Sequence, residues 1–210
     1  MNKLRILGLA GVLGMVASAG TITLPGTGQN VVGGLDQNYQ ITSDTTGLYT
    51  GTVPGDAVIV TNLPAVNNTV VWDTLPGTQW IGPAANQYFT SSGFVGATMY
   101  QTTFSVTNTA NASLDFFVLV DNAVNIFLNG TEVANVGAGN DQYKGFLTPT
   151  FISIGTNFVS GTNFLDFQVL NGGNATGLDI SNTPEPSTLT LAGVALAAVG
   201  LLRFRKRRAA

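Results

Sequence analysis

The side chains of this sequence that could do acid–base chemistry are carboxylates, because the chain contains no histidine and no cysteine. Two carboxylates about 5–10 Å apart can hydrolyse a glycosidic bond. Half of the ten in residues 20–182 stand beside turn residues, however, where Asp side chains usually bond to nearby backbone: Asp36, Asp56, Asp121, Asp141 and Asp179. Without His, Cys or Arg there, catalytic triads and phosphoryl transfer lack their parts. We therefore predict no catalytic residues and no enzyme activity.

Aromatic and amide side chains favour a second chemistry, the binding of carbohydrate. Sugars stack on exposed aromatic rings and exchange hydrogen bonds with Asn, Asp and Gln. In "TQWIGP", Trp80 stands where a strand reaches a loop, which makes it the candidate platform, although a Trp in a β-sandwich often fills the core instead. In "VDNAVNIFLNG", Asn122 and Asn125 are expected to point toward one loop rim. These three residues are the predicted ligand-binding residues.

The charges are distributed unevenly along the chain. Residues 20–182 carry ten carboxylates and one cation, Lys144, so nucleic acid is excluded as a partner. An oxygen-rich, lysine-poor surface suits a hard cation such as Ca²⁺. The alternative is a solvated acidic surface that keeps an exported protein soluble.

The N-terminal residues predict export. Lys3 and Arg5 precede an apolar stretch from Ile6 to Val16, and Ala17-Ser18-Ala19 supplies small residues for cleavage after Ala19. We therefore predict a signal peptide at residues 1–19 and a mature chain that starts near Gly20, the alternative being a buried N-terminal helix.

The C-terminal residues predict a membrane anchor. Pro184-Glu185-Pro186 is followed by an uncharged apolar run, and then by the five cations Arg203, Arg205, Lys206, Arg207 and Arg208. The apolar run from Ser187 to Leu202 reaches about 24 Å as a helix, short of the hydrocarbon core of ~30 Å. Arg203, which can snorkel, and Phe204 extend it to a marginal span over residues 187–204. The basic end at residues 203–208 is expected to stay in the cytoplasm by the positive-inside rule, which leaves the body outside.

These three parts, in this order over residues 183–208, resemble the PEP-CTERM sorting signal of Gram-negative bacteria. The resemblance implies that a membrane enzyme, exosortase, recognises Pro184, Glu185 and Pro186 and processes the chain for delivery to the surface. Residues 183–210 are thus predicted to be a sorting signal and not part of the fold.

Residues 20–182 predict an all-β domain. Short β-rich runs are broken by Gly, Pro and Asn every 8–12 residues or so, which favours eight to ten strands in two antiparallel sheets. "DFFVLVD" is apolar throughout, as expected of a central strand, and Asn129-Gly130 suits a type I′ hairpin turn. In "FLDFQVLN", Leu165, Phe167 and Val169 share one face, with Asp166 and Gln168 opposite.

The order of "GGLDQNYQI", "QWIGPAANQ", "ATMYQTTFSV", "VDNAVNIFLNG" and "FVSGTNFLDFQVLNGGNATGLDI" resembles the galactose-binding-like jelly-roll modules. The resemblance covers most of residues 30–182 and implies a jelly-roll β-sandwich. It also implies one structural Ca²⁺ with Asp36 and Asn38 as contributors.

Together these predictions describe an exported surface protein associated with exopolysaccharide, in the extracellular matrix of a biofilm. Many weak copies on one surface can hold a polymer that a single copy barely binds. Two alternatives remain: a coat or matrix protein that acts by self-association without a sugar, and, less favoured, a glycoside hydrolase.

Overall fold

The computed structural model describes residues 21–66, 69–70, 72–87, 93–137 and 145–182. Within these ranges the regular structure is β-strand, and no helix is long and apolar enough to cross a membrane. The predicted signal peptide, the sorting motif, the transmembrane helix at 187–204 and the basic end lie outside the described residues.

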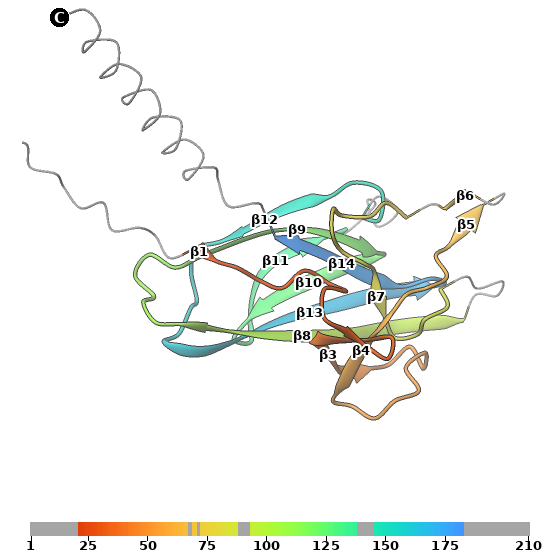
Figure 1. Ribbon diagram of the computed structural model, residues 1–210, viewed down its shortest axis with the longest axis horizontal. Helices are drawn as coiled ribbons and strands as arrows, with labels where there is room; N and C mark the ends of the chain where they lie inside the picture. The colour runs from red at the N-terminus through yellow and green to blue at the C-terminus, as the bar shows by residue number, and fades with distance from the viewer. Residues whose placement is uncertain (1–20, 67–68, 71, 88–92, 138–144, 183–210) are drawn as a thin grey trace, which may run out of the picture.

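The strands are β1 (Thr21–Ile22), β2 (Val31–Val32), β3 (Leu35–Asp44), β4 (Gly55–Ile59), β5 (Ala65–Val66), β6 (Thr69–Val70), β7 (Ile81–Gly82), β8 (Phe94–Val106), β9 (Ser113–Asp121), β10 (Ala123–Leu128), β11 (Thr131–Val136), β12 (Thr150–Ile154), β13 (Gly161–Gly173) and β14 (Gly177–Asn182) (Figure 1). The prediction of an all-β domain is confirmed. The strands outnumber the eight to ten expected, because five of them are two-residue pieces whose sequences carry no periodicity.

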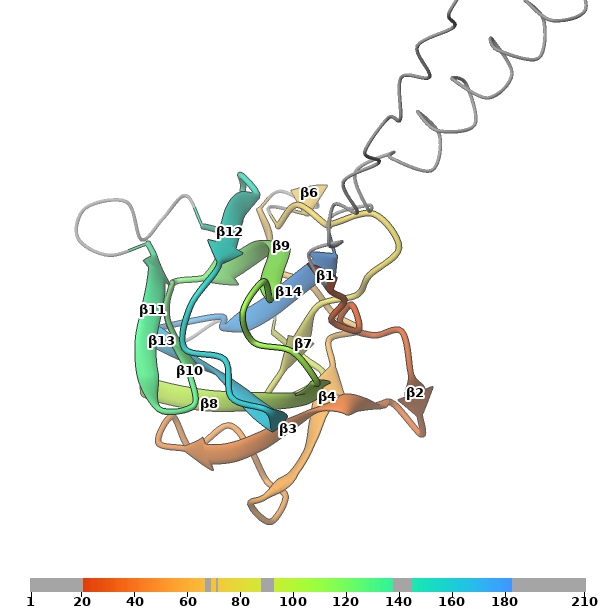
Figure 2. The ribbon, with the colours of Figure 1, turned by 90° about the vertical axis from the view of Figure 1, so that its left-hand side faces the viewer.

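Twelve of the strands belong to one continuous sheet, in the order β1-β9-β14-β7-β4-β3-β8-β13-β10-β11, with β12 on β9 and β2 on β3. All its pairs are antiparallel except that of β1 with β9. The sheet curls, so that β8, β13 and β10 lie across from β9 and β14 (Figure 2). Two separate sheets were expected; instead, the short strands β7 and β4 connect the two layers.

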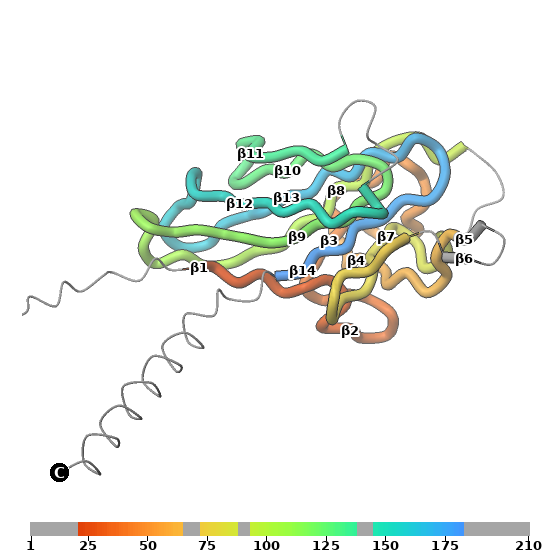
Figure 3. The backbone as a smooth tube through the Cα atoms, turned by 90° about the horizontal axis from the view of Figure 1, so that it is seen from above, coloured from red at the N-terminus to blue at the C-terminus, as the bar shows by residue number. Residues whose placement is uncertain are grey.

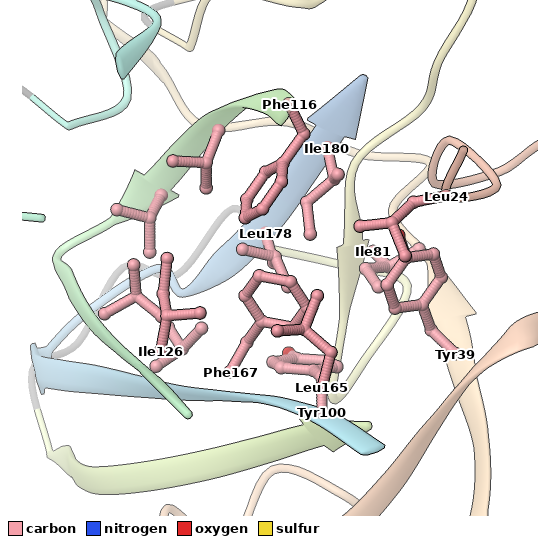
Figure 4. Packing of buried hydrophobic residues seen from close by; sticks show 14 of the residues in the cluster. Leu24, Tyr39, Ile81, Tyr100, Phe116, Ile126, Leu165, Phe167, Leu178 and Ile180 are labelled. Carbon is pink, nitrogen blue, oxygen red and sulfur yellow. The ribbon is translucent and has the colours of Figure 1, made fainter. Parts of the chain in front are cut away.

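The main core fills the space between the two layers. Tyr39, Tyr100, Phe116 and Phe167 are fully buried there, and the Phe116 and Phe167 rings meet edge to face with centroids 5.9 Å apart (Figure 4). These side chains point inward because successive residues of a strand alternate between its two faces.

Three local predictions are confirmed. "DFFVLVD" lies in β9, which pairs with β12 along one edge and with β14 along the other. Asn129 and Gly130 turn β10 into β11 with φ of 51° and 80°, as a type I′ turn requires. Leu165, Phe167 and Val169 are fully buried on one face of β13.

Both ends of the described chain lie at the same end of the domain. Leu114 pairs with Ile154 of β12 on one edge of β9 and with Ile22 of β1 on the other. Since β14 occupies the second edge and ends at Asn182 beside Phe116, β1 and the end of β14 are neighbours (Figure 3).

Candidate functional site

Trp80, the predicted aromatic platform, is buried. It is 2% exposed, its ring lies 4.1 Å from that of Trp72 between centroids, and its Nε1–H donates to the Asp73 carbonyl at 2.7 Å. The segment at residues 72–80 lies over the outer side of β9 and β14, and with Val60 it forms a second apolar cluster with Leu119 and Ala175. The prediction that Trp80 is exposed is therefore wrong, and the core-filling alternative holds.

Two buried carboxylates fasten this segment to the sheet. Asp121 Oδ2 accepts from Trp72 Nε1 at 2.8 Å, and its Oδ1 is buried without a hydrogen-bond partner among the described residues. Burial raises the pKa of Asp121 to about 7, opposed by the bond from Trp72. Asp179 accepts from Thr27 Oγ1 at 2.9 Å and from the Leu75 amide at 3.0 Å. Burial also raises the pKa of Asp179, and these hydrogen bonds lower it, but by less.

Asn122 and Asn125 both bond to β13, but not at a shared rim with Trp80. Asn122 Oδ1 accepts from the Gly172 amide at 2.8 Å. Asn125 Nδ2 donates to Gln168 Oε1 at 3.2 Å on the outer face of the sheet. The structure therefore does not gather the three predicted ligand-binding residues into one site, and only Asn125 belongs to an accessible set of polar residues.

Asp36, predicted to contribute to a calcium site, is fully buried. Its Oδ2 accepts from the Gly28 amide at 2.7 Å and its Oδ1 from the Asn38 amide at 2.9 Å, so the carboxylate holds the turn before β3. Burial raises the pKa of Asp36, and the two hydrogen bonds from backbone amides lower it, but by less. In the described part of the chain no three acidic side chains are grouped to hold a metal ion. The calcium site at Asp36 and Asn38 stays a prediction.

The outer surface of β3, β8, β13 and β10 carries a row of amide and carboxylate side chains, which we call the amide face: Gln40, Gln101, Asn125, Asp166 and Gln168. The strand register brings them together, because Asp166 pairs with Gln101, Gln101 with Gln40, and Gln168 with Asn125. Gln101 Nε2 donates to Asp166 Oδ1 at 2.7 Å. These hydrogen bonds order the side chains and leave further donors and acceptors to a ligand.

An aromatic side chain lies on the same face. Phe164 is 45% exposed and stands two residues before Asp166 on β13, which places both on one side of the strand. Amides, one carboxylate and an exposed ring together can bind a polymer rich in hydroxyl groups. The sequence alternation identified Asp166 and Gln168 as facing outward. It carried no signal that Gln101 and Gln40 lie beside them, because that depends on strand register.

Comparison with known proteins identifies the C-terminal segment. Residues 182–208 match the family model described as "PEP-CTERM protein-sorting motif". The predicted sorting signal is thus confirmed: the chain is an all-β domain followed by a motif that indicates a secreted protein, anchored in the membrane before processing and destined for the cell surface. No curated protein matches the chain.

Solved structures are similar only at a distance. They include a rhamnosidase from Novosphingobium sp. PP1Y, 22% identical over 37% of this chain and 7% of that one, with a TM-score of 0.27. A family 35 carbohydrate binding module from an environmental isolate is 10% identical over 60% of this chain and 87% of that one, with a TM-score of 0.29. A β-glucuronidase from Ruminococcus gnavus is 13% identical over 70% of this chain and 28% of that one, with a TM-score of 0.33. The chain thus spans less than a third of either enzyme, and we base no assignment on these similarities.

Proposed function

We propose that this chain is a non-enzymatic exosortase substrate of a Gram-negative bacterium, whose jelly-roll ectodomain of the galactose-binding-like kind holds exopolysaccharide through the amide face. The sorting part of the proposal rests on the PEP-CTERM motif at residues 182–208. The membrane would hold the chain with its body outside until exosortase acts.

The binding part rests on one observation, the ordered row of amides beside an exposed ring. Gln101, Asp166 and Gln168 stand on neighbouring strands of a rigid sheet, and no cation belongs to the row. Fixed side chains lose little conformational entropy when a ligand binds, so preorganisation favours affinity. The chemistry matches hydroxyl-rich chains. One copy would bind weakly, and many copies on a surface would hold a polymer by avidity.

Self-association without a sugar is the competing function. In the described chain, β12 pairs with β9 along one edge only, and it carries Phe151, which is 52% exposed and packs against Phe117 with centroids 5.5 Å apart. An open strand edge with an exposed aromatic side chain is a surface on which a second copy could pair.

Replacing Phe164 by Ala should weaken binding of the full chain to exopolysaccharide about tenfold, or roughly 1.4 kcal/mol, because the ring supplies the apolar contact. Depletion of the purified chain from solution by the polymer measures this. Phe151→Ala is the matched control, since it removes an equally exposed ring from another surface, and it should leave binding unchanged.

The same assay separates the alternatives. If the wild-type chain is not depleted but forms oligomers as its concentration rises, and Phe151→Ala prevents them, the coat-protein function is correct and the proposal is wrong. Repeating depletion and thermal unfolding in a chelator tests the calcium prediction, which requires the melting temperature to fall and Asp36→Asn to remove that difference.

A further inference from the structure

A pocket of about 430 Å³ opens at the end of the domain where Thr21 and Asn182 lie. Its walls come from three parts of the chain: β1 with the residue after it, the last residues of β8, and the connection from β8 to β9. Pairing of β1 with Ser113 and Leu114, and of Ser105 and Val106 with β13, holds these walls in place. The volume is within the range of about 300–1,000 Å³ that small-molecule sites occupy.

The polar part of the wall is neutral. Six of the residues that line it are polar, four with hydroxyl and two with amide side chains: Thr21, Thr23, Ser105, Thr107, Asn108 and Asn111. Asn108 Oδ1 accepts from the Ala110 amide at 3.0 Å, which shapes the loop. No other hydrogen bond of these six side chains is formed within the described residues, so their donors and acceptors are directed to solvent or to a ligand.

The apolar part of the wall is Ile22, Phe104 and Val106. Phe104 is half-buried, and the Phe158 ring packs edge-on against it with centroids 6.2 Å apart. The pocket therefore combines aromatic and aliphatic residues with residues that carry hydroxyls and amides.

This composition restricts the ligand. Cationic side chains favour a phosphate or carboxylate ligand and carboxylates favour a metal ion, and neither kind of side chain lines the pocket. A lipid chain would cover the polar groups of the wall without replacing their hydrogen bonds to water, which is costly. A sugar ring satisfies both parts of the wall, because it has hydroxyls at its rim and C–H groups on its faces.

We propose that this pocket binds one uncharged saccharide unit, at a site separate from the amide face. The amide face runs along the outer surface of β8 and β13, whereas the pocket lies at the end of β8 beside β1. The ectodomain would then have two contacts with carbohydrate, one along a polymer and one for a single unit or a chain end. The pocket can bind a sugar whether or not the amide face does.

Titration of the full chain with lactose and with maltose tests the proposal, in a zwitterionic detergent that contains no sugar head group. We expect saturable binding of at least one of them, in the millimolar range that a single small site commonly gives (about −4 kcal/mol at 1 mM). Asn111→Trp should abolish binding by filling the pocket, and Asn111→Ala, which only removes an amide, should weaken it severalfold. Asn111 is an exposed loop residue, so both variants should keep the wild-type melting temperature.

Phe151→Ala serves as the control and should bind these disaccharides as the wild type does, because it removes an exposed ring from β12, a strand that belongs to neither carbohydrate site. The proposal is wrong if neither disaccharide binds, or if Asn111→Trp binds like the wild type. The polymer assay and the disaccharide assay use different variants. If the pocket proposal fails, the proposal for the amide face therefore still stands, and the reverse also holds.

Discussion

Replacing Trp80 by Ala is expected to lower the free energy of unfolding by about 3–5 kcal/mol. The side chain is 2% exposed and its ring packs against Trp72, so the substitution leaves a cavity in the second apolar cluster. The hydrogen bond from Trp80 Nε1 to the partly buried Asp73 carbonyl is lost too, which adds to the loss of stability. Urea unfolding followed by tryptophan fluorescence, now from Trp72 alone, measures the change.

Two controls make this result specific. Phe164→Ala removes a ring that is 45% exposed and should cost far less stability. Gly177→Ala adds a methyl group that would lie 2.9 Å from the Trp72 ring and 3.0 Å from the Trp80 ring, so overpacking should destabilise the same cluster by about 1–3 kcal/mol. An unfolding free energy unchanged in Trp80→Ala would contradict the structure, and would reopen a role for Trp80 at the surface.

Stability is expected to fall as the pH rises from about 4 to about 7. The pKa of Asp121 is raised to about 7 in the folded chain by burial, whereas an unfolded Asp titrates near 3.9. Between these two pH values Asp121 holds a proton in the folded chain but not in the unfolded chain. The stability that Asp121 contributes is therefore complete below the unfolded pKa and is lost as the pH rises through the folded pKa. Asp121 contributes about 2–4 kcal/mol to the change in the free energy of unfolding. Burial also raises the pKa values of Asp36 and Asp179, which therefore change the stability in the same direction.

The measurement is the free energy of unfolding as a function of pH, for the wild type and for Asp121→Asn. Asn is close in shape, can still accept from Trp72 Nε1, and does not titrate, so the slope between pH 4 and pH 7 should become shallower. An identical slope in the two chains would show that Asp121 is ionised throughout and that the burial argument is wrong.

The sequence predicts features that depend on neighbouring residues, and it does not predict contacts between residues far apart in the chain. The Asn129-Gly130 turn and the inward face of Leu165, Phe167 and Val169 depend on neighbours in the sequence, and both were predicted correctly. Trp80 was wrongly chosen as the exposed platform over the core-filling alternative, because its burial depends on residues 72–80 lying over β9 and β14. From its neighbours in "QWIGP", Trp80 is expected at a strand end in contact with solvent, whether or not another segment of the chain covers it.

The candidate sites show the same limit. Asp166 and Gln168 were correctly expected to face away from the core, but Gln101 comes from a strand some sixty residues earlier and joins them through strand register. The pocket combines residues 21–23 with residues 104–111, which no periodicity connects. Asn122 and Asn125, which are three positions apart, were grouped by sequence proximity, yet each bonds to a different residue of β13.

The central claim is that the motif delivers the chain to the surface and the amide face holds it on polysaccharide. Fractionation of the producing cells, with an antibody against the ectodomain, tests both steps in one measurement. The wild type should be found in the surface polysaccharide fraction. A chain with Pro184, Glu185 and Pro186 replaced by Ala should stay in the inner membrane, whereas Phe164→Ala should be exported but released into the medium. If the motif variant reaches the polysaccharide fraction as the wild type does, and Phe164→Ala remains there, the account is contradicted.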